Sequence, residues 1–96
     1  MKPFSVYILE CEDGSFYTGY AADVEARFAL HLSGRGAKYT RSHRPRRIIY
    51  REMLPDKSAA MSREWAIKRM SRKEKEGLIQ RSMHDVGTEK LSGGNE

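Results

Sequence analysis

The stretch that decides the fold is Phe4 to Tyr20, FSVYILECEDGSFYTGY. Two short runs of strand-forming residues flank Glu12-Asp13-Gly14, and such a turn sequence between such runs is typical of a β-hairpin. One tyrosine stands on each run, at Tyr7 and at Tyr17. The chain is therefore predicted to begin with a hairpin that carries one phenol on each strand.

The length of the turn decides whether the two phenols share a face. Opposed residues of an antiparallel pair have a constant sum of residue numbers and point the same way. A two-residue Asp13-Gly14 turn sends Tyr7 and Tyr17 to opposite faces, whereas a three-residue turn with a left-handed Gly14 pairs Leu9 with Tyr17 and keeps them together. We favour the second register because the opposite face then carries an apolar set suited to a core, namely Phe4, Val6, Ile8, Phe16 and Tyr20.

Composition bounds the class of protein. The 96 residues suit one domain whose core can be stable without disulfides or a structural metal. Charged residues make up 32% of the chain. The single Cys11 excludes an internal disulfide and a thiolate zinc cluster, which favours a reducing compartment. The N-terminus lacks the features of a signal peptide, and no apolar run approaches the ~18 residues of a membrane span. We expect a cytoplasmic protein with no membrane partner.

Periodicity and capping signals divide the rest of the chain. Asp23 and Gly34 bound a helix over 24–33, with Val24, Phe28 and Leu32 as its apolar stripe. A loop over 35–46, with one helical turn near 37–41, leads to a strand over 47–54. A helix capped by Asp56 or Ser58 runs to about residue 70, and a last helix over 72–82 starts with a Ser71–Glu74 capping box. Residues 83–96 are predicted to be a disordered tail.

The charge is concentrated in one run. Between residues 26 and 51 there is no acidic residue, while eight arginine and lysine side chains occur there. A solvated loop is one interpretation; we favour a nucleic-acid footprint because the run is rich in arginine and interleaved with glycine and aromatic residues. The candidate nucleic-acid contacts are Arg35, Lys38, Tyr39, Arg41, His43, Arg44, Arg46 and Arg47.

Two polar residues accompany the apolar stripe of the first helix. Arg27 and His31 are one turn apart and are expected to flank the core at its boundary. Taken singly, each favours a structural role: Arg27 as a stem lying along apolar surface with its head in water, and His31 as a structural histidine.

A carboxylate interrupts the apolar side of the 56–70 helix. The apolar residues expected on that side are Ala60, Met61, Trp65 and Ile67. Glu64 projects between Ala60 and Met61, which costs stability unless the carboxylate is paired or binds a cation. A salt bridge, to Arg27 or Lys68 for example, and a metal-ligand role both stay open.

Taken in order, Tyr7, Tyr17, Arg27, His31 and Glu64 form a pattern that resembles the GIY-YIG nuclease domains. Ser5-Val6-Tyr7 stands at the GIY position and Tyr17-Thr18-Gly19 at YIG, and GAKYTRSHRP and REWAIKRMSRKEK strengthen the match. The resemblance covers about residues 4–80 and is closest to small stand-alone bacterial members. It implies an α/β (α+β) domain over residues 1–82, with a three-stranded antiparallel sheet flanked by three or four helices.

The resemblance also implies a reaction. Family members hydrolyse phosphodiesters with one divalent cation, here Mg²⁺ or Mn²⁺, for which Glu64 matches the carboxylate ligand. Tyr7 matches the residue that deprotonates the attacking water. Because a free phenol has a pKa near ~10, this role requires Tyr7 to be pushed toward phenolate by the metal, by Arg27 or by a proton acceptor such as His31, which would take part in the proton relay. Arg27 matches the residue that binds the scissile phosphate, and Tyr17 would position water or phosphate. The expected enzyme is an endonuclease or exonuclease that acts on DNA more than on RNA, with structured or damaged DNA among the candidate substrates.

Two departures from the family pattern bear on activity. Ser5 replaces the first glycine of GIY, which is a backbone matter, and the asparagine that often follows the glutamate is missing, with Lys68 or Lys73 as possible substitutes. The alternative is thus a catalytically weak or inactive nucleic-acid-binding module, and a third interpretation is a small domain whose basic face binds protein. No separate specificity domain is predicted, so weak specificity or targeting through a partner protein is expected.

Overall fold

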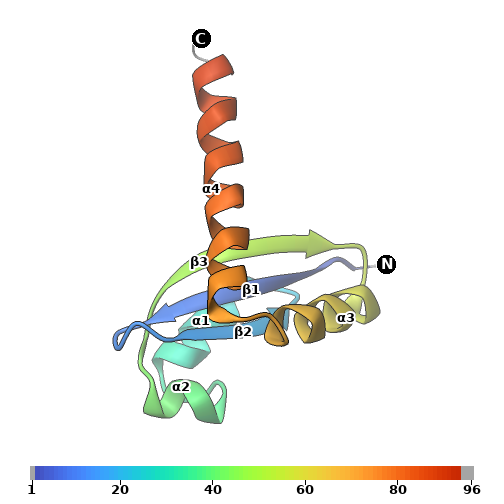
Figure 1. Cartoon of the computed structure of the whole chain (residues 1–96). Helices are drawn as coiled ribbons and strands as arrows, with labels where there is room; N and C mark the ends of the chain where they lie inside the picture. Colours follow the sequence, from blue (N-terminus) through green and yellow to red (C-terminus); the bar gives the residue numbers. More distant parts are fainter. Residues whose placement is uncertain (1, 94–96) are drawn as a thin grey trace.

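The computed structural model describes the backbone of residues 2–93 and the side chains of residues 2–82. Three strands form one antiparallel sheet, and four helices surround it, which confirms the predicted α+β fold (Figure 1). The elements are β1 (Phe4–Cys11), β2 (Phe16–Ala21), α1 (Val24–Leu32), α2 (Lys38–Ser42), β3 (Pro45–Leu54), α3 (Lys57–Lys68) and α4 (Arg72–Gly93). None of the described helices combines the length and the apolar character that a membrane crossing needs.

The hairpin has the three-residue turn. Leu9 lies opposite Tyr17, and Tyr7 lies opposite Gly19. The Cys11 N–H donates to the Ser15 carbonyl at 2.8 Å, and Gly14 takes a φ of +86°. The register that places both phenols on one face is confirmed.

Strand β1 is the middle of the sheet, in the order β2-β1-β3, and it is buried on both faces. On one, the core face, Val6 and Ile8 pack against Ala60 and Ile67 of α3 and Ile79 of α4. The predicted apolar partners also lie there, partly buried: Phe4, Phe16 and Tyr20. On the other, the tyrosine face, Tyr7 and Leu9 pack with Ala21, with Val24 and Phe28 of α1, and with Tyr17. The same strand thus supports a core and a candidate site.

The predicted helix caps are present. Asp23 accepts from the Ala26 N–H at 3.0 Å and Asp56 from the Ala59 N–H at 2.8 Å. Ser71 and Glu74 form the capping box, because each backbone N–H donates to the other's side chain, at 2.8 and 3.1 Å. These local bonds fix where α1, α3 and α4 begin.

Two predicted apolar stripes differ from those observed. On α1, Leu32 is exposed and His31 is 2% exposed, so His31 takes the inward position. On α3, Met61 and Trp65 are exposed and only Ala60 and Ile67 are buried. Helical spacing defines an approximate stripe, and the packing partners decide which residue at its edge is covered.

Helix α4 extends to Gly93, eleven residues beyond the predicted end at residue 82, so that boundary is wrong. No proline occurs there, and a helix-interior glycine costs only about 1 kcal/mol, which does not by itself end a helix. The rest of the predicted tail, residues 94–96, lies outside the described residues. Figure 1 shows α4 projecting away from the sheet.

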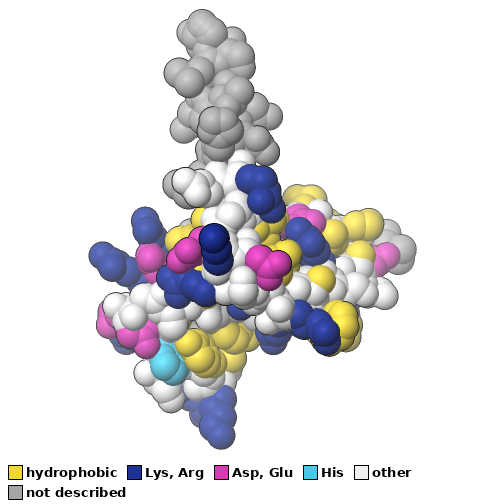
Figure 2. Space-filling model, in the orientation of Figure 1, with side chains coloured by type: hydrophobic (Ala, Val, Ile, Leu, Met, Phe, Trp, Pro, Cys, Tyr) yellow, Lys and Arg dark blue, Asp and Glu magenta, His cyan; other side chains and the backbone are white. Residues whose placement is uncertain are grey.

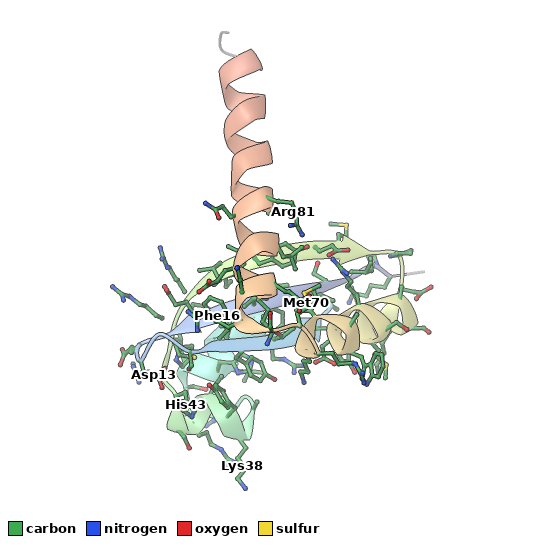
Figure 3. The ribbon with its side chains drawn as sticks, viewed as in Figure 1. Asp13, Phe16, Lys38, His43, Met70 and Arg81 are labelled. Carbon is green, nitrogen blue, oxygen red and sulfur yellow. The ribbon has the colours of Figure 1, made fainter. Side chains whose placement is uncertain are left out.

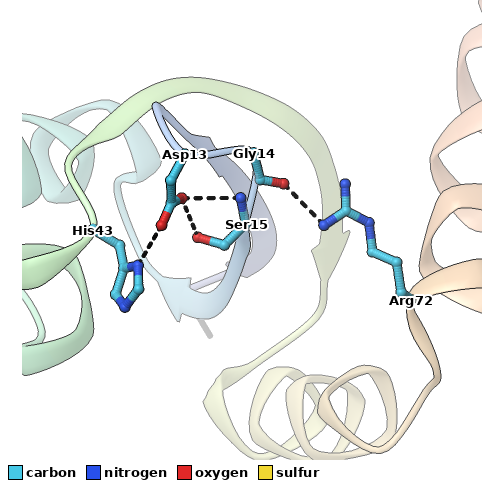
Figure 4. Close-up of polar contacts among 5 residues, drawn as sticks. All are labelled: Asp13, Gly14, Ser15, His43 and Arg72. Carbon is cyan, nitrogen blue, oxygen red and sulfur yellow. Dashed lines mark hydrogen bonds and ion pairs between the residues drawn. The ribbon is translucent and has the colours of Figure 1, made fainter.

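The first turn of α4 is fastened to the hairpin. The Arg72 guanidinium lies 3.6 Å from the centre of the Phe16 ring and donates to the Gly14 carbonyl at 2.9 Å (Figure 4). Its Nε also donates to Glu76 at 2.9 Å. These contacts hold the start of α4 against the core face, where Leu78 and Ile79 complete the packing.

Candidate active site

A buried hydrogen bond forms the centre of the site. The Tyr7 hydroxyl lies 2.8 Å from Nε2 of His31, and neither residue is more than 2% exposed. Gly19, opposite Tyr7 on β2, leaves the room for the phenol, because a Cβ there would lie 2.6 Å from the hydroxyl oxygen. Tyr7 and His31 come from different elements, β1 and α1, and meet because α1 covers the tyrosine face.

The hydrogen bonds of Thr40 determine which ring nitrogen of His31 carries the proton. Thr40 has one hydroxyl proton and donates it to the Ala37 carbonyl at 2.9 Å. Its oxygen lies 2.8 Å from Nδ1 of His31, so it accepts there and Nδ1 holds the ring proton. Nε2 then accepts from Tyr7. The Ala37 N–H, 3.4 Å from the same Nδ1, would require the other tautomer, but that contact is too long to outweigh the two shorter ones.

Burial keeps this pair neutral at pH 7. Burial raises the pKa of Tyr7, and the neighbouring Tyr17 raises it further. Burial also lowers the pKa of His31, and the positive charge of Arg27 lowers it more. Tyr7 is therefore a protonated donor and His31 an unprotonated acceptor, so the shift of Tyr7 toward phenolate that the sequence led us to expect is opposed by burial.

Tyr17 extends the site through a row of aromatic rings. Its ring lies edge-on to His31 at 5.0 Å between centroids and stacks on Tyr39 at 6.0 Å. Tyr39 stacks in turn on His43 at 4.0 Å. The row leads from the buried pair to the surface of α2.

The hairpin turn holds the outer end of this row. Asp13 accepts from Nδ1 of His43 at 2.6 Å and from both the N–H and the hydroxyl of Ser15, at 3.0 and 2.6 Å (Figures 3 and 4). The hydrogen bonds from Ser15, followed by that from His43, hold the pKa of Asp13 well below its usual range. Asp13 is thus a charged partner for His43 at neutral pH.

Glu64 borders the same face from α3. Its side chain is 18% exposed, and its carboxylate lies 3.3 Å from Nζ of Lys68. Burial raises the pKa of Tyr17, the charge of Lys68 lowers it and that of Glu64 raises it. Glu64 is therefore within electrostatic reach of the phenols. Of the two salt-bridge partners considered from sequence, the structure pairs it with Lys68.

Arg27 is the exposed cation of the group. Burial raises the pKa of Tyr7 and of Tyr17, and the charge of Arg27 opposes both shifts. It also acts on His31, as described above. The five residues predicted from sequence thus meet on one side of the sheet, with Tyr7 and His31 in direct contact and Arg27 and Glu64 at the border.

Comparison with known proteins fits this arrangement. The GIY-YIG catalytic domain family matches residues 3–77 of the chain. The chain belongs to this family. GIY-YIG domains are endonuclease domains, and the matched range includes the aromatic pair and its charged neighbours.

Relatives of similar size support the assignment. A UPF0213 protein of Staphylococcus haemolyticus is 52% identical over 80 residues, which cover 83% of this chain and 98% of that protein. The solution NMR structure of a UPF0213 protein from Bacillus halodurans is 49% identical, covers 81% and 83% of the two chains and has a TM-score of 0.53. That of a protein from E. faecalis is 40% identical, covers 86% and 88% and has a TM-score of 0.59.

GIY-YIG nucleases typically use a divalent cation, and the donor set here fits one loosely held ion. Among the described residues, no three His, Cys, Asp or Glu side chains gather as a metal site. Glu64 offers a single half-buried carboxylate. Mg²⁺ is commonly held by one or two carboxylates, with water and substrate phosphate as its other ligands. Glu64 would therefore hold the ion only together with bound substrate.

The basic run is less isolated in space than in sequence. Acidic residues from other segments pair with three of its arginines: Arg44 with Glu12 at 3.4 Å, Arg47 with Glu10 at 2.7 Å and Arg51 with Glu25 at 2.6 Å. Figure 2 shows these two kinds of charge interleaved at the hairpin end of the molecule. Arg47 also lies on the core face. It is opposite Glu10 in the sheet, and Glu10 points the same way as Ile8, which is two residues earlier on β1. The run has no acidic residue of its own, but the fold places carboxylates from other segments beside three of its arginines.

Sequence reasoning missed two residues that support the site. Thr40, which is 2% exposed, fixes the tautomer of His31. Gly36 lies against the same ring, where a Cβ would come within van der Waals overlap of Nδ1. Both residues belong to the segment GAKYT, residues 36–40. The prediction used this segment only for its charges and for its resemblance to the family.

Proposed function

We propose that the protein is a metal-dependent nuclease that hydrolyses phosphodiester bonds in nucleic acid, in DNA rather than RNA. The observation that carries the proposal is the 2.8 Å hydrogen bond from Tyr7 to a neutral His31, at a site bordered by Arg27 and Glu64. Membership of the GIY-YIG family supports it.

The hydrogen bond gives the attacking water a route for its proton. Because Tyr7 is neutral, it would accept a proton from water on its phenol oxygen while it passes its own proton to Nε2 of His31. No free phenolate is needed, so the raised pKa of Tyr7 does not prevent the transfer. The imidazolium that forms would keep its Nδ1–H bond to Thr40.

The remaining groups would hold the phosphate. The Arg27 guanidinium would bind the scissile phosphate and offset the charge that develops on its oxygens. Glu64 would hold the divalent cation, which when bound polarises the phosphate as a Lewis acid. Tyr17 would position the water or a phosphate oxygen from beside Tyr7.

A nucleic-acid-binding module of low activity is the second candidate, and two features of the site favour it. Lys68 is ion-paired with the Glu64 carboxylate, so a divalent cation would have to displace Lys68 in order to bind there. Burial of Tyr7 and His31 opposes any charge on either ring. Both features would lower the rate without weakening the binding of phosphate.

Substitution of the border residues tests the proposal. Glu64→Gln and Arg27→Ala are expected to lower the cleavage rate with Mg²⁺ or Mn²⁺ by roughly 100-fold or more, because each removes a group that acts on transition-state charge. Cleavage of labelled duplex, single-stranded and branched DNA, and of RNA, is the measurement. Glu76→Gln is the matched control, since it removes an exposed carboxylate that pairs with Arg72 on α4.

The two candidates give different results. Retained affinity in both variants, with cleavage lost, supports the nuclease. If purified wild-type protein with Mg²⁺ or Mn²⁺ leaves every substrate intact and still binds, the binding module replaces it. Absence of salt-sensitive binding would favour a protein partner for the basic face.

A further inference from the structure

The outward side of α3 carries an exposed indole beside the site. Successive residues of a helix are about 100° apart, so Glu64, Lys68, Met61, Trp65 and Arg69 follow one another around α3 and its C-terminal cap. Glu64 faces the tyrosine face at one end of this order. Trp65 is 62% exposed and Met61 46%, and Trp65 belongs to neither core cluster.

Positive charge surrounds this indole. The Arg69 guanidinium lies 4.5 Å from the centre of the Trp65 ring, a cation–π contact at the surface. Lys68 and Arg69 lie on either side of Trp65 in the order given above, and Glu64 is the one acidic residue between 57 and 71. An exposed aromatic ring flanked by cations matches a polyanion with aromatic bases better than it matches an apolar protein surface.

Lys68 joins this surface to the active site. Its Nζ lies 3.3 Å from the Glu64 carboxylate and 6.0 Å from the centre of the Tyr17 ring. A strand whose phosphate lies at Arg27 and Glu64 therefore reaches the Trp65 side of α3 by passing Lys68. The two surfaces are continuous.

We propose that Trp65 and Arg69 form a second nucleic-acid contact, on which an unpaired nucleobase beside the scissile phosphate stacks against the indole. Arg69 contacts the phosphate next to that base. This inference rests on the proposed nuclease function and specifies its substrate: a strand with at least one unstacked nucleotide near the cleavage position.

Trp65 is the only tryptophan in the chain, so its fluorescence reports on this contact alone. The titration uses the Glu64→Gln variant without divalent cation, so that the strand stays intact. A single-stranded oligonucleotide is expected to quench the fluorescence with the same Kd as fluorescence anisotropy of the labelled strand gives. Trp65→Leu is expected to weaken binding by about 5-fold or more, the effect of losing one stacked base. Met53→Ala, which removes an exposed apolar side chain from β3, is the control and should leave affinity unchanged.

A set of strands with one abasic nucleotide moved along the sequence separates stacking from charge. Quenching that disappears at one or two abasic positions supports the proposal. Uniform quenching at all positions, or binding without quenching, overturns it. Because cleavage by the wild-type protein is measured separately, loss of this contact and loss of the nuclease function are distinguishable.

Discussion

At the scale of single residues, the chemistry of the buried pair Tyr7–His31 depends on Thr40. It holds the ring proton of His31 on Nδ1 and so leaves Nε2 free to accept from Tyr7. It touches neither the water nor the phosphate of the proposed reaction, so it is a positioning residue. Its hydroxyl does this with one donated and one accepted hydrogen bond.

Thr40→Val tests this role because the two side chains have nearly the same shape. The substitution leaves the His31 Nδ1–H without its partner and removes one hydrogen bond from the Ala37 carbonyl, which should lower the free energy of unfolding by about 1–3 kcal/mol. It should also shift the tautomer of His31, seen in the ¹⁵N chemical shifts of the ring, and lower cleavage. Thr40→Ser should restore both; a Val variant with the native tautomer and full activity would contradict the assignment.

The burial of His31 also shows a limit of sequence prediction at this scale. Helical spacing allows His31 or Leu32 to face inward, and hydropathy favours the leucine. The fold buries the histidine because Tyr7 and Thr40 satisfy both ring nitrogens, and one of these partners lies 24 residues away in the chain. Such partners are known only once the elements are packed.

At the scale of elements, the connection between α1 and α2 is shaped by close contact. Gly36 lies against the His31 ring, whose two nitrogens are already held by hydrogen bonds. A side chain at this position would push the connection away from the ring and disturb the position of α2. The connection therefore aligns α2, with its aromatic and basic residues, against the site.

The same chemical change at two glycines should act in opposite directions. Gly36→Ala should lower the free energy of unfolding by about 1–3 kcal/mol through overpacking. Gly77→Ala on α4 should raise it by about 0.5–1 kcal/mol, since its Cβ meets only Arg81 at ordinary contact distance and alanine favours the helix. Urea unfolding measures both, and equal effects would mean that Gly36 is not packed as described.

Elements set by local rules were predictable, and elements set by distant contacts were not. The number of residues in the hairpin turn predicted the strand register, and hence which residues lie on each face of β1. The capping residues predicted where α1, α3 and α4 begin. The exposure of Trp65 depends on how α3 packs against the sheet, which helical spacing alone does not contain.

At the scale of the whole molecule, the chain has a net charge of +5, and the cations of its basic run divide into ion-paired and unpaired groups. Arg44, Arg47 and Arg51 are ion-paired with carboxylates from elsewhere in the fold. The basic residues Arg35, Lys38 and Arg41, on and before α2, form no ion pair within the part of the chain that the structure describes. Arg27 and Arg46 likewise form no ion pair among the described residues, so these five are the cations of the run that remain for phosphate.

Salt titration of binding separates these two groups of cations. Each phosphate contact adds about 0.9 to the slope of log K against log salt concentration for duplex DNA. Arg41→Gln should lower the slope by about one, whereas Arg47→Gln, which removes a cation paired with Glu10 on the core face, should leave it unchanged. An equal loss in both variants would indicate that nucleic acid reaches both faces of the sheet.

The burial of β1 on both faces also constrains how the gene can change in length. Even-numbered residues such as Val6 and Ile8 belong to the core, and odd-numbered residues such as Tyr7 and Leu9 belong to the tyrosine face. A deletion of one codon within this strand would exchange the two sets, so that core and site would be lost in the same event. We therefore expect insertions and deletions to be tolerated in the turn at 12–14 and in other connections, and the strand itself to tolerate substitution alone.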